Sequence, residues 1–295
     1  MRLRHTGLGH PPEADRTPAI DIAPGARPDI SRGMAVAQYH VSLNGLTHVF
    51  SDGQSPLTAL QGVSFSVPAG QFLSIIGPSG CGKSTLLRIA GGLLRPSEGT
   101  ALIREEPPER AQRQREIGFV FQDPALLPWR NVLANVRLPL EIDGIRRTRP
   151  LPDPEALLDL IGLAGFRDYY PHQLSGGMQQ RVAIARALAF DPWLLLMDEP
   201  FGALDEITRS AMRYELLHLR AATDSAGRKT VLFVTHSIAE ALVLSDRIVV
   251  LSRRPGRVIA DLDVELARPR TQEIERSAAF LDYSDYLRGL LQEAA

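Results

Sequence analysis

The sequence predicts an α/β fold with a mixed or parallel sheet at its core, an antiparallel β subdomain near the N-terminus and a helical subdomain inserted between strands. Three short, continuously apolar runs, Phe72–Ile76, Trp193–Met197 and Val231–Thr235, are typical of strands buried on both faces. In Val36–Leu46 and Leu60–Val67 the apolar residues instead tend to alternate, which favours antiparallel strands with one solvated face.

Composition restricts the function classes open to the chain. The hydrophobic fraction of 44% and the charged fraction of 23% are those of a soluble globular protein. The formal net charge of −1 gives no global electrostatic case for binding nucleic acid. No apolar run approaches the roughly 18 residues that span a bilayer, so we expect any membrane association to come through a partner. Cys81 is the single cysteine, which excludes an intrachain disulfide and suits the cytosol.

Three segments are expected along the chain. Residues 1–33 contain five prolines with glycine and arginine and no periodicity, which predicts a disordered extension without a secretory signal. Residues 34–267 hold the α/β domain, with the helical subdomain at about 123–189. Residues 268–295 mix charges with spaced apolar residues, which indicates a tail of one or two amphipathic helices.

The first candidate site is the segment Gly77–Thr85, which fits the pattern Gly-x-x-x-x-Gly-Lys-[Ser/Thr] of a phosphate-binding loop. It follows the expected strand Phe72–Ile76 and precedes the helix-like Leu86–Ala90, which is the context such a loop requires. Glycines let successive backbone N–H groups turn toward phosphate oxygens, and the helix presents its positive end to the same anion. The loop residues are Gly77, Pro78, Ser79, Gly80, Cys81, Gly82, Lys83, Ser84 and Thr85.

Side chains of this loop have separate expected roles. Lys83 can reach the β- and γ-phosphates of ATP, and the Ser84 hydroxyl is the expected ligand of Mg²⁺. Of the 33 basic residues only Lys83 and Lys229 are lysines, so a compact ammonium stands at the phosphate position of an otherwise arginine-rich chain. Because Cys81 lies inside the loop, we expect a thiol reagent to block nucleotide binding and ATP to protect the thiol.

Two further residues stand next to expected strands. Phe50 precedes the predicted turn Ser51–Pro56 and could stack on an adenine, although an aromatic residue of a core strand fits its spacing equally well. Gln122 ends the predicted strand Ile117–Phe121, at the sheet edge where α/β folds place ligand contacts. On position alone, an ordinary loop glutamine is the simpler interpretation of Gln122.

The segment 123–189 contains prolines between helix-like stretches, which predicts a helical insertion interrupted by prolines such as Pro139. Helices are expected at Val132–Leu140, Pro154–Ile161 and Met178–Ala189.

Ser175, Gly176 and Gly177 directly precede the last of these helices, which gives the chain a second helix start suited to an anion. Taken alone, Ser175 fits an ordinary N-cap better than a ligand site.

Acidic and imidazole groups follow the other two apolar strands. Asp198 and Glu199 end the strand Trp193–Met197; the first can hold Mg²⁺ and the second can deprotonate an attacking water. His236 stands at the end of its strand as Gln122 and Asp198 stand at theirs, and it can hydrogen-bond a phosphate and the catalytic water. The alternatives are a solvated acidic turn and a structural histidine. They are less favoured here, because the phosphate loop needs an acidic partner at a buried strand and because Gln122, Asp198 and His236 share one relation to their strands.

The remaining elements are predicted from periodicity and turn residues. They are a turn at Pro96–Gly99, a polar connection at Arg104–Arg115, a helix at Glu206–Ala222, a strand at Arg247–Leu251, a turn at Arg253–Gly256 and a short strand at Val258–Ile259.

With these residues in view, the chain from Val36 to Pro269 resembles an ABC transporter ATPase subunit, a P-loop NTPase of the ABC type. The order and separations of its motifs match that family. Gly77–Thr85 is similar to the family's Walker A loop, Gln122 to its Q-loop glutamine and Leu174–Met178 to its signature. Leu194–Asp198 resembles the Walker B strand, and Glu199 resembles the catalytic glutamate that follows it. Asp205 is similar to the D-loop aspartate and His236 to the switch histidine.

Details of the motifs resemble one group within the family. Met178 stands where the commonest signature has glutamine, with Gln179 following. This signature, together with the segments Leu127–Val132 and Pro200–Asp205, looks most like the nitrate, sulfonate and taurine importers of bacteria.

The resemblance implies a head-to-tail homodimer with ATP between Walker A of one chain and the signature of the other. Ser175 and Gly177 would then complete the partner's γ-phosphate site. It also implies a separate membrane permease, bound by the groove around Gln122–Trp129, and an extracytoplasmic solute-binding protein. The chain would lie peripherally on the cytoplasmic side of the inner membrane and take up a small, anionic sulfur- or nitrogen-containing solute.

The expected chemistry is hydrolysis of ATP with Mg²⁺. Glu199 is the predicted general base, His236 and Gln122 position water and Mg²⁺, and Lys83 neutralises charge that develops on the phosphates. Two rival interpretations are a soluble ABC ATPase acting on nucleic acid or ribosomes, and a catalytically inactive interaction subunit. The first usually carries two cassettes or a long insert, and the second is disfavoured by the presence of both Glu199 and His236.

Overall fold

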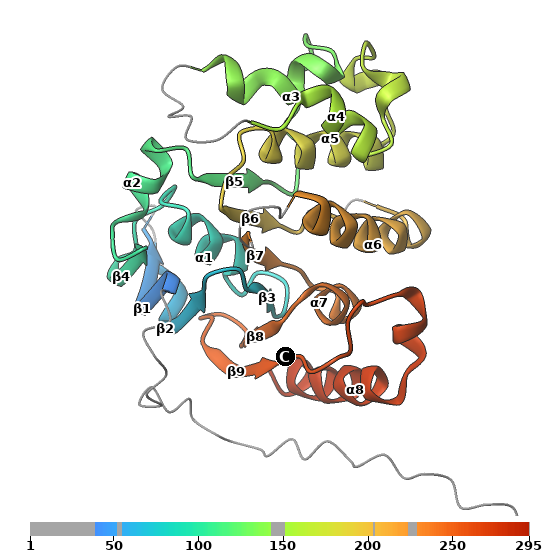
Figure 1. The fold of residues 1–295 in the computed structure, drawn as a ribbon. Coiled ribbons are helices and arrows are strands. Elements are labelled where there is room, and N and C mark those ends of the chain that lie inside the picture. The colour runs from blue at the N-terminus through green and yellow to red at the C-terminus, as the bar shows by residue number, and fades with distance from the viewer. Residues whose placement is uncertain (1–38, 52–54, 143–150, 203, 224–228, 295) are drawn as a thin grey trace, which may run out of the picture. The chain divides into compact units, whose positions relative to one another are not determined.

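The computed structural model describes residues 39–51, 55–142, 151–202, 204–223 and 229–294. The predicted extension at residues 1–33 therefore lies outside the described residues, as do Val36 and its neighbours. The described residues form two sheets with helices around them (Figure 1).

The smaller sheet has three antiparallel strands in the order β2-β1-β4. Val63, Phe65 and Val67 are buried, as the alternation predicts for antiparallel strands with one solvated face. The sequence analysis missed β4, having assigned its start to a turn, because most of its residues are polar or exposed. The strands are β1 (Tyr39–Phe50), β2 (Leu57–Pro68) and β4 (Glu98–Ile103).

The larger sheet has six strands in the order β5-β6-β7-β3-β8-β9. Its neighbours pair in parallel except β8 and β9, so the mixed sheet is confirmed. All residues of β3, β6 and β7 are buried, which explains their continuous apolarity. The strands are β3 (Phe72–Ile76), β5 (Ile117–Val120), β6 (Leu194–Asp198), β7 (Thr230–Val234), β8 (Arg247–Leu251) and β9 (Val258–Asp263), the last being longer than predicted.

Helices cover both faces of the larger sheet (Figure 1). One core cluster joins α1 to the smaller sheet and to β3, β6, β7 and β8, so α1 lies between the two sheets. A second cluster joins α7 and α8 to β8. The helices α2 and α7 were not predicted, since α2 lies within a polar stretch and α7 is apolar almost throughout and so shows no helical periodicity. The bounds are α1 (Lys83–Ala90), α2 (Pro108–Arg113), α6 (Glu206–Thr223), α7 (Ile238–Leu244) and α8 (Ala278–Glu293).

Three helices lie between β5 and β6 in the chain and pack on one another (Figure 1). The helix predicted at Val132–Leu140 is confirmed as α3, although Pro139, one of the prolines expected to break the segment, lies inside it. A proline in the last turn of a helix removes one hydrogen bond, while the buried apolar face of α3 still packs against α5. These helices are α3 (Val132–Glu141), α4 (Pro154–Leu160) and α5 (Gly176–Leu188), with short 3-10 turns at Ala164–Phe166, Pro171–Gln173 and, before α8, Gln272–Arg276.

A polar contact between β1 and β7 joins the two sheets. His40 Nδ1 of β1 lies 2.6 Å from Thr230 Oγ1 of β7, and the same hydroxyl accepts the Gly70 N–H at 2.9 Å. The His40 ring also packs on Trp193, with ring centroids 4.5 Å apart. No helix within the described part of the chain has the length and apolarity needed to cross a bilayer.

Candidate functional site

The phosphate loop connects β3 to α1 and is fixed in place by close backbone contacts. A Cβ on Gly77 would lie 2.9 Å from the Leu251 carbonyl oxygen, and one on Gly82 would lie 2.8 Å from the Ala59 carbonyl oxygen. Gly82 also has a φ of 101° as the residue that caps α1, a conformation that side chains disfavour. The glycines of the motif therefore permit both the left-handed turn and its tight packing between β2 and β8.

Lys83 begins α1, and its ammonium folds back over the loop. Nζ donates hydrogen bonds to the carbonyl oxygens of Gly77 at 2.9 Å and Pro78 at 3.1 Å. It also lies 3.7 Å from Glu199 Oε1, and Lys83 is only 5% exposed. A buried cation at a loop of backbone N–H groups gives the loop the positive potential that polyphosphate binding requires.

Ser84 and Asp198 meet although they are far apart in the sequence. Ser84 Oγ donates a hydrogen bond to Asp198 Oδ1 at 2.8 Å. Burial raises the pKa of Asp198 above its usual range, and this hydrogen bond acts in the opposite direction. Mg²⁺ in nucleotide sites commonly takes one or two protein oxygens beside phosphate and water. A hydroxyl and a buried carboxylate at the end of β6 are donors that fit this ion.

Glu199 and His236 bring the ends of β6 and β7 together. His236 Nδ1 lies 3.1 Å from Glu199 Oε2, while Glu199 Oε1 faces Lys83. The Glu199 backbone has a φ of 43° and donates its N–H to Val234 O at 2.9 Å. A non-glycine residue in this left-handed region is strained, which is common where a side chain must be aimed at a site. The carboxylate is thereby held between an imidazole and an ammonium.

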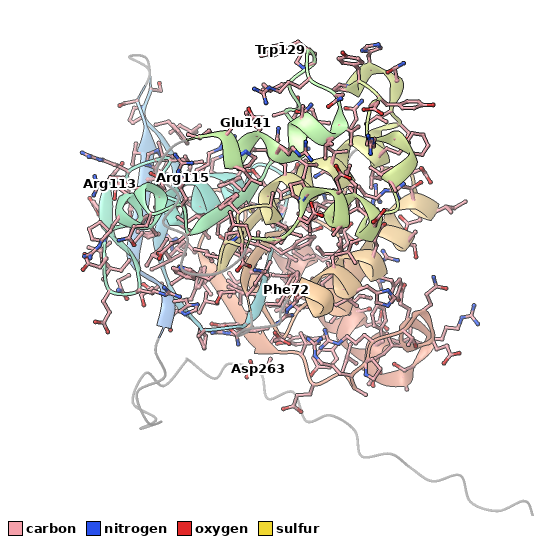
Figure 2. The ribbon with its side chains drawn as sticks, turned by 45° about the horizontal axis from the view of Figure 1, so that its top comes forward. Phe72, Arg113, Arg115, Trp129, Glu141 and Asp263 are labelled. Atoms are coloured by element: carbon pink, nitrogen blue, oxygen red, sulfur yellow. The ribbon has the colours of Figure 1, made fainter. Side chains whose placement is uncertain are left out.

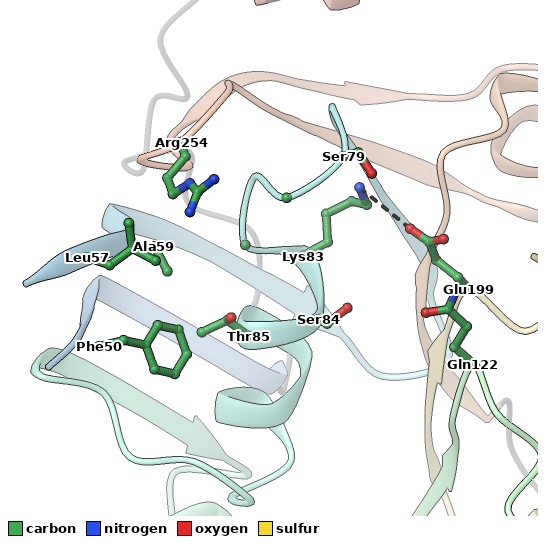
Figure 3. Close-up of a pocket in the computed structure, with 12 residues that line it drawn as sticks. Phe50, Leu57, Ala59, Ser79, Lys83, Ser84, Thr85, Gln122, Glu199 and Arg254 are labelled. Carbon is green, nitrogen blue, oxygen red and sulfur yellow. Dashed lines mark ion pairs between the residues drawn. The ribbon is translucent and has the colours of Figure 1, made fainter. Parts of the chain in front are cut away.

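These groups line a pocket of about 330 Å³ at the mouth of the larger sheet. Figure 3 shows Glu199 and Gln122 on one side of the phosphate loop and Phe50 with Leu57 on the other. The pocket residues are Phe50, Leu57, Ala59, Ser79, Gly80, Gly82, Lys83, Ser84, Thr85, Gln122, Glu199 and Arg254. The structure therefore gathers Phe50, Gln122 and most of the phosphate loop around one space.

The two open interpretations of Phe50 are decided in part by its exposure. Phe50 is 41% exposed at the end of β1 and meets the His48 ring edge to face, with centroids 4.5 Å apart. The core-aromatic alternative is therefore wrong, and stacking on adenine stays a prediction. Gln122 lies two residues beyond β5 and is exposed toward the same pocket.

Ser175, Gly176, Gly177 and Asp205 are not among the residues that line this pocket. Ser175 Oγ accepts the Met178 N–H at 3.3 Å and so acts as the N-cap of α5. Asp205 accepts the Thr208 N–H at 3.0 Å, and this hydrogen bond lowers the pKa of its carboxyl. Within one chain both residues serve helix starts, and their contribution to a partner's site stays a prediction.

The structure corrects the expectation about Cys81. The residue is 1% exposed, and its thiol belongs to the core cluster beneath the loop. Burial raises the pKa of the thiol, which lowers the fraction of reactive thiolate. The folded chain is therefore not expected to react readily with thiol reagents, and Cys81 contributes to the loop through its backbone.

Three pocket residues were missed by the sequence analysis: Leu57, Ala59 and Arg254. Leu57 and Ala59 belong to the start of β2, which begins earlier than its alternation indicated. Arg254 lies in the turn between β8 and β9, and no sequence signal places that turn beside the phosphate loop.

Comparisons with known proteins agree with this site. Residues 60–202 match a protein family described as ABC transporter. An uncharacterised ABC transporter ATP-binding protein of Methanocaldococcus jannaschii is 44% identical over 253 residues, covering 86% of this chain and 91% of that protein. A taurine import ATP-binding protein of Rhizobium johnstonii is 43% identical, with 79% and 88% covered. A nitrate import ATP-binding protein of Synechocystis is 38% identical, with 86% and 95% covered.

Solved structures are similar as well. A dimeric ATP-binding cassette in a post-hydrolysis state bound to ADP and Pi superposes with a TM-score of 0.64 at 35% identity. The match covers 76% of this chain and 99% of that one. With its phosphate loop, its two sheets and these relatives, the chain belongs to the ATP-binding cassette family as a transporter ATPase of the nitrate, sulfonate and taurine type.

Proposed function

We propose that the chain is the ATP-hydrolysing subunit of an ABC importer that takes up a small solute related to taurine or nitrate. The observation that carries the proposal is the Glu199 carboxylate, which lies 3.1 Å from His236 Nδ1 and 3.7 Å from Lys83 Nζ beside the phosphate loop. The names of the taurine and nitrate import relatives support the solute class.

The phosphate chain of ATP would lie on the loop 77–85. Its backbone N–H groups and the start of α1 face the phosphates, and Lys83 neutralises their charge. Mg²⁺, held by Ser84 Oγ, Asp198 and the Gln122 side chain, would offset charge on the β- and γ-phosphate oxygens. The exposed ring of Phe50 offers a stacking surface for the adenine at the opposite end of the pocket.

Glu199 would act as the general base on the attacking water. Its carboxylate is 19% exposed, so a water can reach it while the backbone of β7 holds its position. His236 Nδ1 hydrogen-bonds the same carboxylate, and about half of the His236 side chain stays exposed. In this arrangement the imidazole fixes the carboxylate and can contact the γ-phosphate.

A second copy of the chain would complete the site. Ser175 to Gly177 present a helix N-terminus with the open space beside Gly176 that a close backbone approach requires. Asp205 and the start of α6 lie next to it, because a Cβ on Gly177 would be 2.9 Å from Thr208 Cγ2. Ser175, Gly176 and Asp205 are exposed and would meet the phosphate loop of the partner, and the dimeric state of the solved relative supports this arrangement.

A permease would dock around Gln122–Trp129, next to a groove beside β5. This groove of about 440 Å³ is mainly apolar and includes Phe119, Phe121 and Ile142. Trp129 is 71% exposed on the segment that leads from Gln122 to α3, and Figure 2 shows it at the tip of the helical part. Because β5 runs directly into Gln122, movement in the groove can reach the site through a short covalent path. The chain would then lie at the cytoplasmic face of the inner membrane, and a solute-binding protein would deliver the solute to the permease.

The test of this function is release of phosphate from Mg-ATP by the purified chain, alone and with membranes that contain its permease. We expect hydrolysis that requires Mg²⁺ and rises with the loaded permease. Absence of hydrolysis in both preparations would contradict the proposal. Stimulation by DNA, RNA or ribosomes without recruitment to membranes would instead favour the soluble ATPase alternative.

A further inference from the structure

The backbone of the turn Arg253–Gly256 is hydrogen-bonded to β2 and packs against the phosphate loop. The Gly256 N–H donates to Ala59 O at 2.9 Å, and Gly256 O accepts the Gln61 N–H at 3.0 Å. A Cβ on Gly256 would lie 2.2 Å from Cys81 O, so the two backbones are in direct contact. The β8–β9 turn is therefore part of the wall of the nucleotide pocket.

The arginines of this turn differ in what they contact. Arg253 Nε donates to Ala294 O at 3.2 Å, and Arg257 Nη2 donates to Gln61 Oε1 at 2.6 Å. Arg254 forms no hydrogen bond or ion pair with any other residue that the structure describes. Instead it lines the nucleotide pocket, with Nη2 3.9 Å from the Cβ position of Gly80.

The position of Arg254 complements that of Lys83. Figure 3 shows the guanidinium above the loop on the side of Leu57 and Ala59, whereas Lys83 points toward Glu199. The Lys83 charge is shared with a carboxylate 3.7 Å away, while the described carboxylates form no ion pair with Arg254. A guanidinium presents several N–H groups in one plane, which suits the non-bridging oxygens of a phosphate.

We propose that Arg254 binds the phosphate chain of the nucleotide from the side of the loop opposite Lys83. This inference rests on the proposed nucleotide site and adds a residue to it. Because Gly80 lies within the loop, the contact falls on phosphates that ATP and ADP share. Arg254 then sets affinity for both nucleotides and has a smaller part in the chemical step carried by Glu199.

The experiment compares Arg254→Ala, Arg254→Lys and the charge-matched control Arg257→Ala by calorimetric titration with ATP, ADP and AMP. For Arg254→Ala we expect about tenfold weaker binding of ATP and of ADP, the effect of losing one charge-assisted contact. Arg254→Lys should fall between wild type and Arg254→Ala, and AMP binding should change least. Thermal unfolding without nucleotide should be unchanged, since the side chain has no partner among the described residues.

Failure of the inference about Arg254 and failure of the proposed function would give different results. Equal ATP and ADP affinities for wild type and Arg254→Ala would overturn it, as would an equal loss in Arg257→Ala, which would indicate a net-charge effect. A wild-type chain that binds ATP keeps the proposed nucleotide site in either case. A wild-type chain that binds no nucleotide would reject the proposed function itself.

Discussion

At the scale of single residues, we expect the ammonium of Lys83 to be a main contributor of positive charge to the proposed nucleotide site. It is nearly buried, donates hydrogen bonds to two loop carbonyls and lies close to Glu199, so these contacts hold it at the loop. A buried lysine paired in this way costs desolvation free energy, which a bound polyphosphate would offset.

We expect Lys83→Ala to weaken ATP binding by roughly 10- to 100-fold, because a partly desolvated charge contact to phosphate is lost. The measurement is a fluorescence or calorimetric titration with Mg-ATP. Arg95→Ala removes the same charge from a side chain that is 90% exposed, and its affinity should stay at the wild-type level. An unchanged affinity in Lys83→Ala would contradict the role of this residue.

Which residues share the site could be predicted from the sequence where a motif or a buried strand fixes their positions. Lys83 and Ser84 were predicted because the motif itself specifies a strand, a turn and a helix, and Glu199 because it follows a continuously apolar strand; the structure brings all three side chains close to one another or to Asp198. Arg254 could not be predicted, since its position depends on a turn that packs on β2 through Gly256. The burial of Cys81 was likewise hidden, because spacing within a loop does not say which way a side chain points.

At the scale of elements, the contact between β1 and β7 makes stability depend on pH. Burial, and to a smaller extent the nearby Arg104, lowers the pKa of His40 from 6.5 to about 4. In the unfolded chain this histidine takes up a proton near pH 6.5, while the folded chain keeps it neutral down to about pH 4. Folding stability from His40 is therefore full above pH 6.5 and declines as the pH falls toward 4.

We expect His40→Asn to flatten the dependence of unfolding free energy on pH between about 6.5 and 4, by up to roughly 3 kcal/mol. Urea unfolding at several pH values, wild type against variant, measures this difference. The control is His218→Asn, which changes an exposed histidine on α6. If wild type and His40→Asn lose stability in parallel on acidification, the buried His40 contact is not the cause.

Elements were predicted where their periodicity is strong. The buried strands β3, β6 and β7 are continuously apolar, and the sequence located them. The strand β4 was missed because its hydrogen bonds to β1 compensate for a polar, largely exposed sequence. The helix α7 was missed because its residues other than Glu240 are all apolar, so it shows no helical periodicity, although Ser237 caps it.

At the scale of the whole molecule, the pocket of one chain leaves out one of the two helix starts suited to an anion. Glu199, Lys83 and the phosphate loop meet in that pocket, while Ser175 at the start of α5 does not line it. A second copy placed head to tail would bring its own Ser175 to this loop and receive the same contact in return. Two nucleotides would then be held between two chains, which couples binding to closure and hydrolysis to reopening.

We expect ATP to join two copies of the chain and Glu199 then to start hydrolysis. Glu199→Gln keeps the size and polarity of the side chain but removes the base, so hydrolysis should fall by about 100-fold or more. The nucleotide contacts should persist, and the dimer that wild type passes through briefly should accumulate.

The most direct test is light scattering of Glu199→Gln with Mg-ATP and with Mg-ADP, alongside phosphate release and the control Glu273→Gln, an exposed carboxylate on the tail. We predict that ATP doubles the mass from 32.4 kDa, that ADP leaves it unchanged and that turnover is lost. Near-normal turnover, or a mass that stays at that of one chain in ATP, would contradict this account.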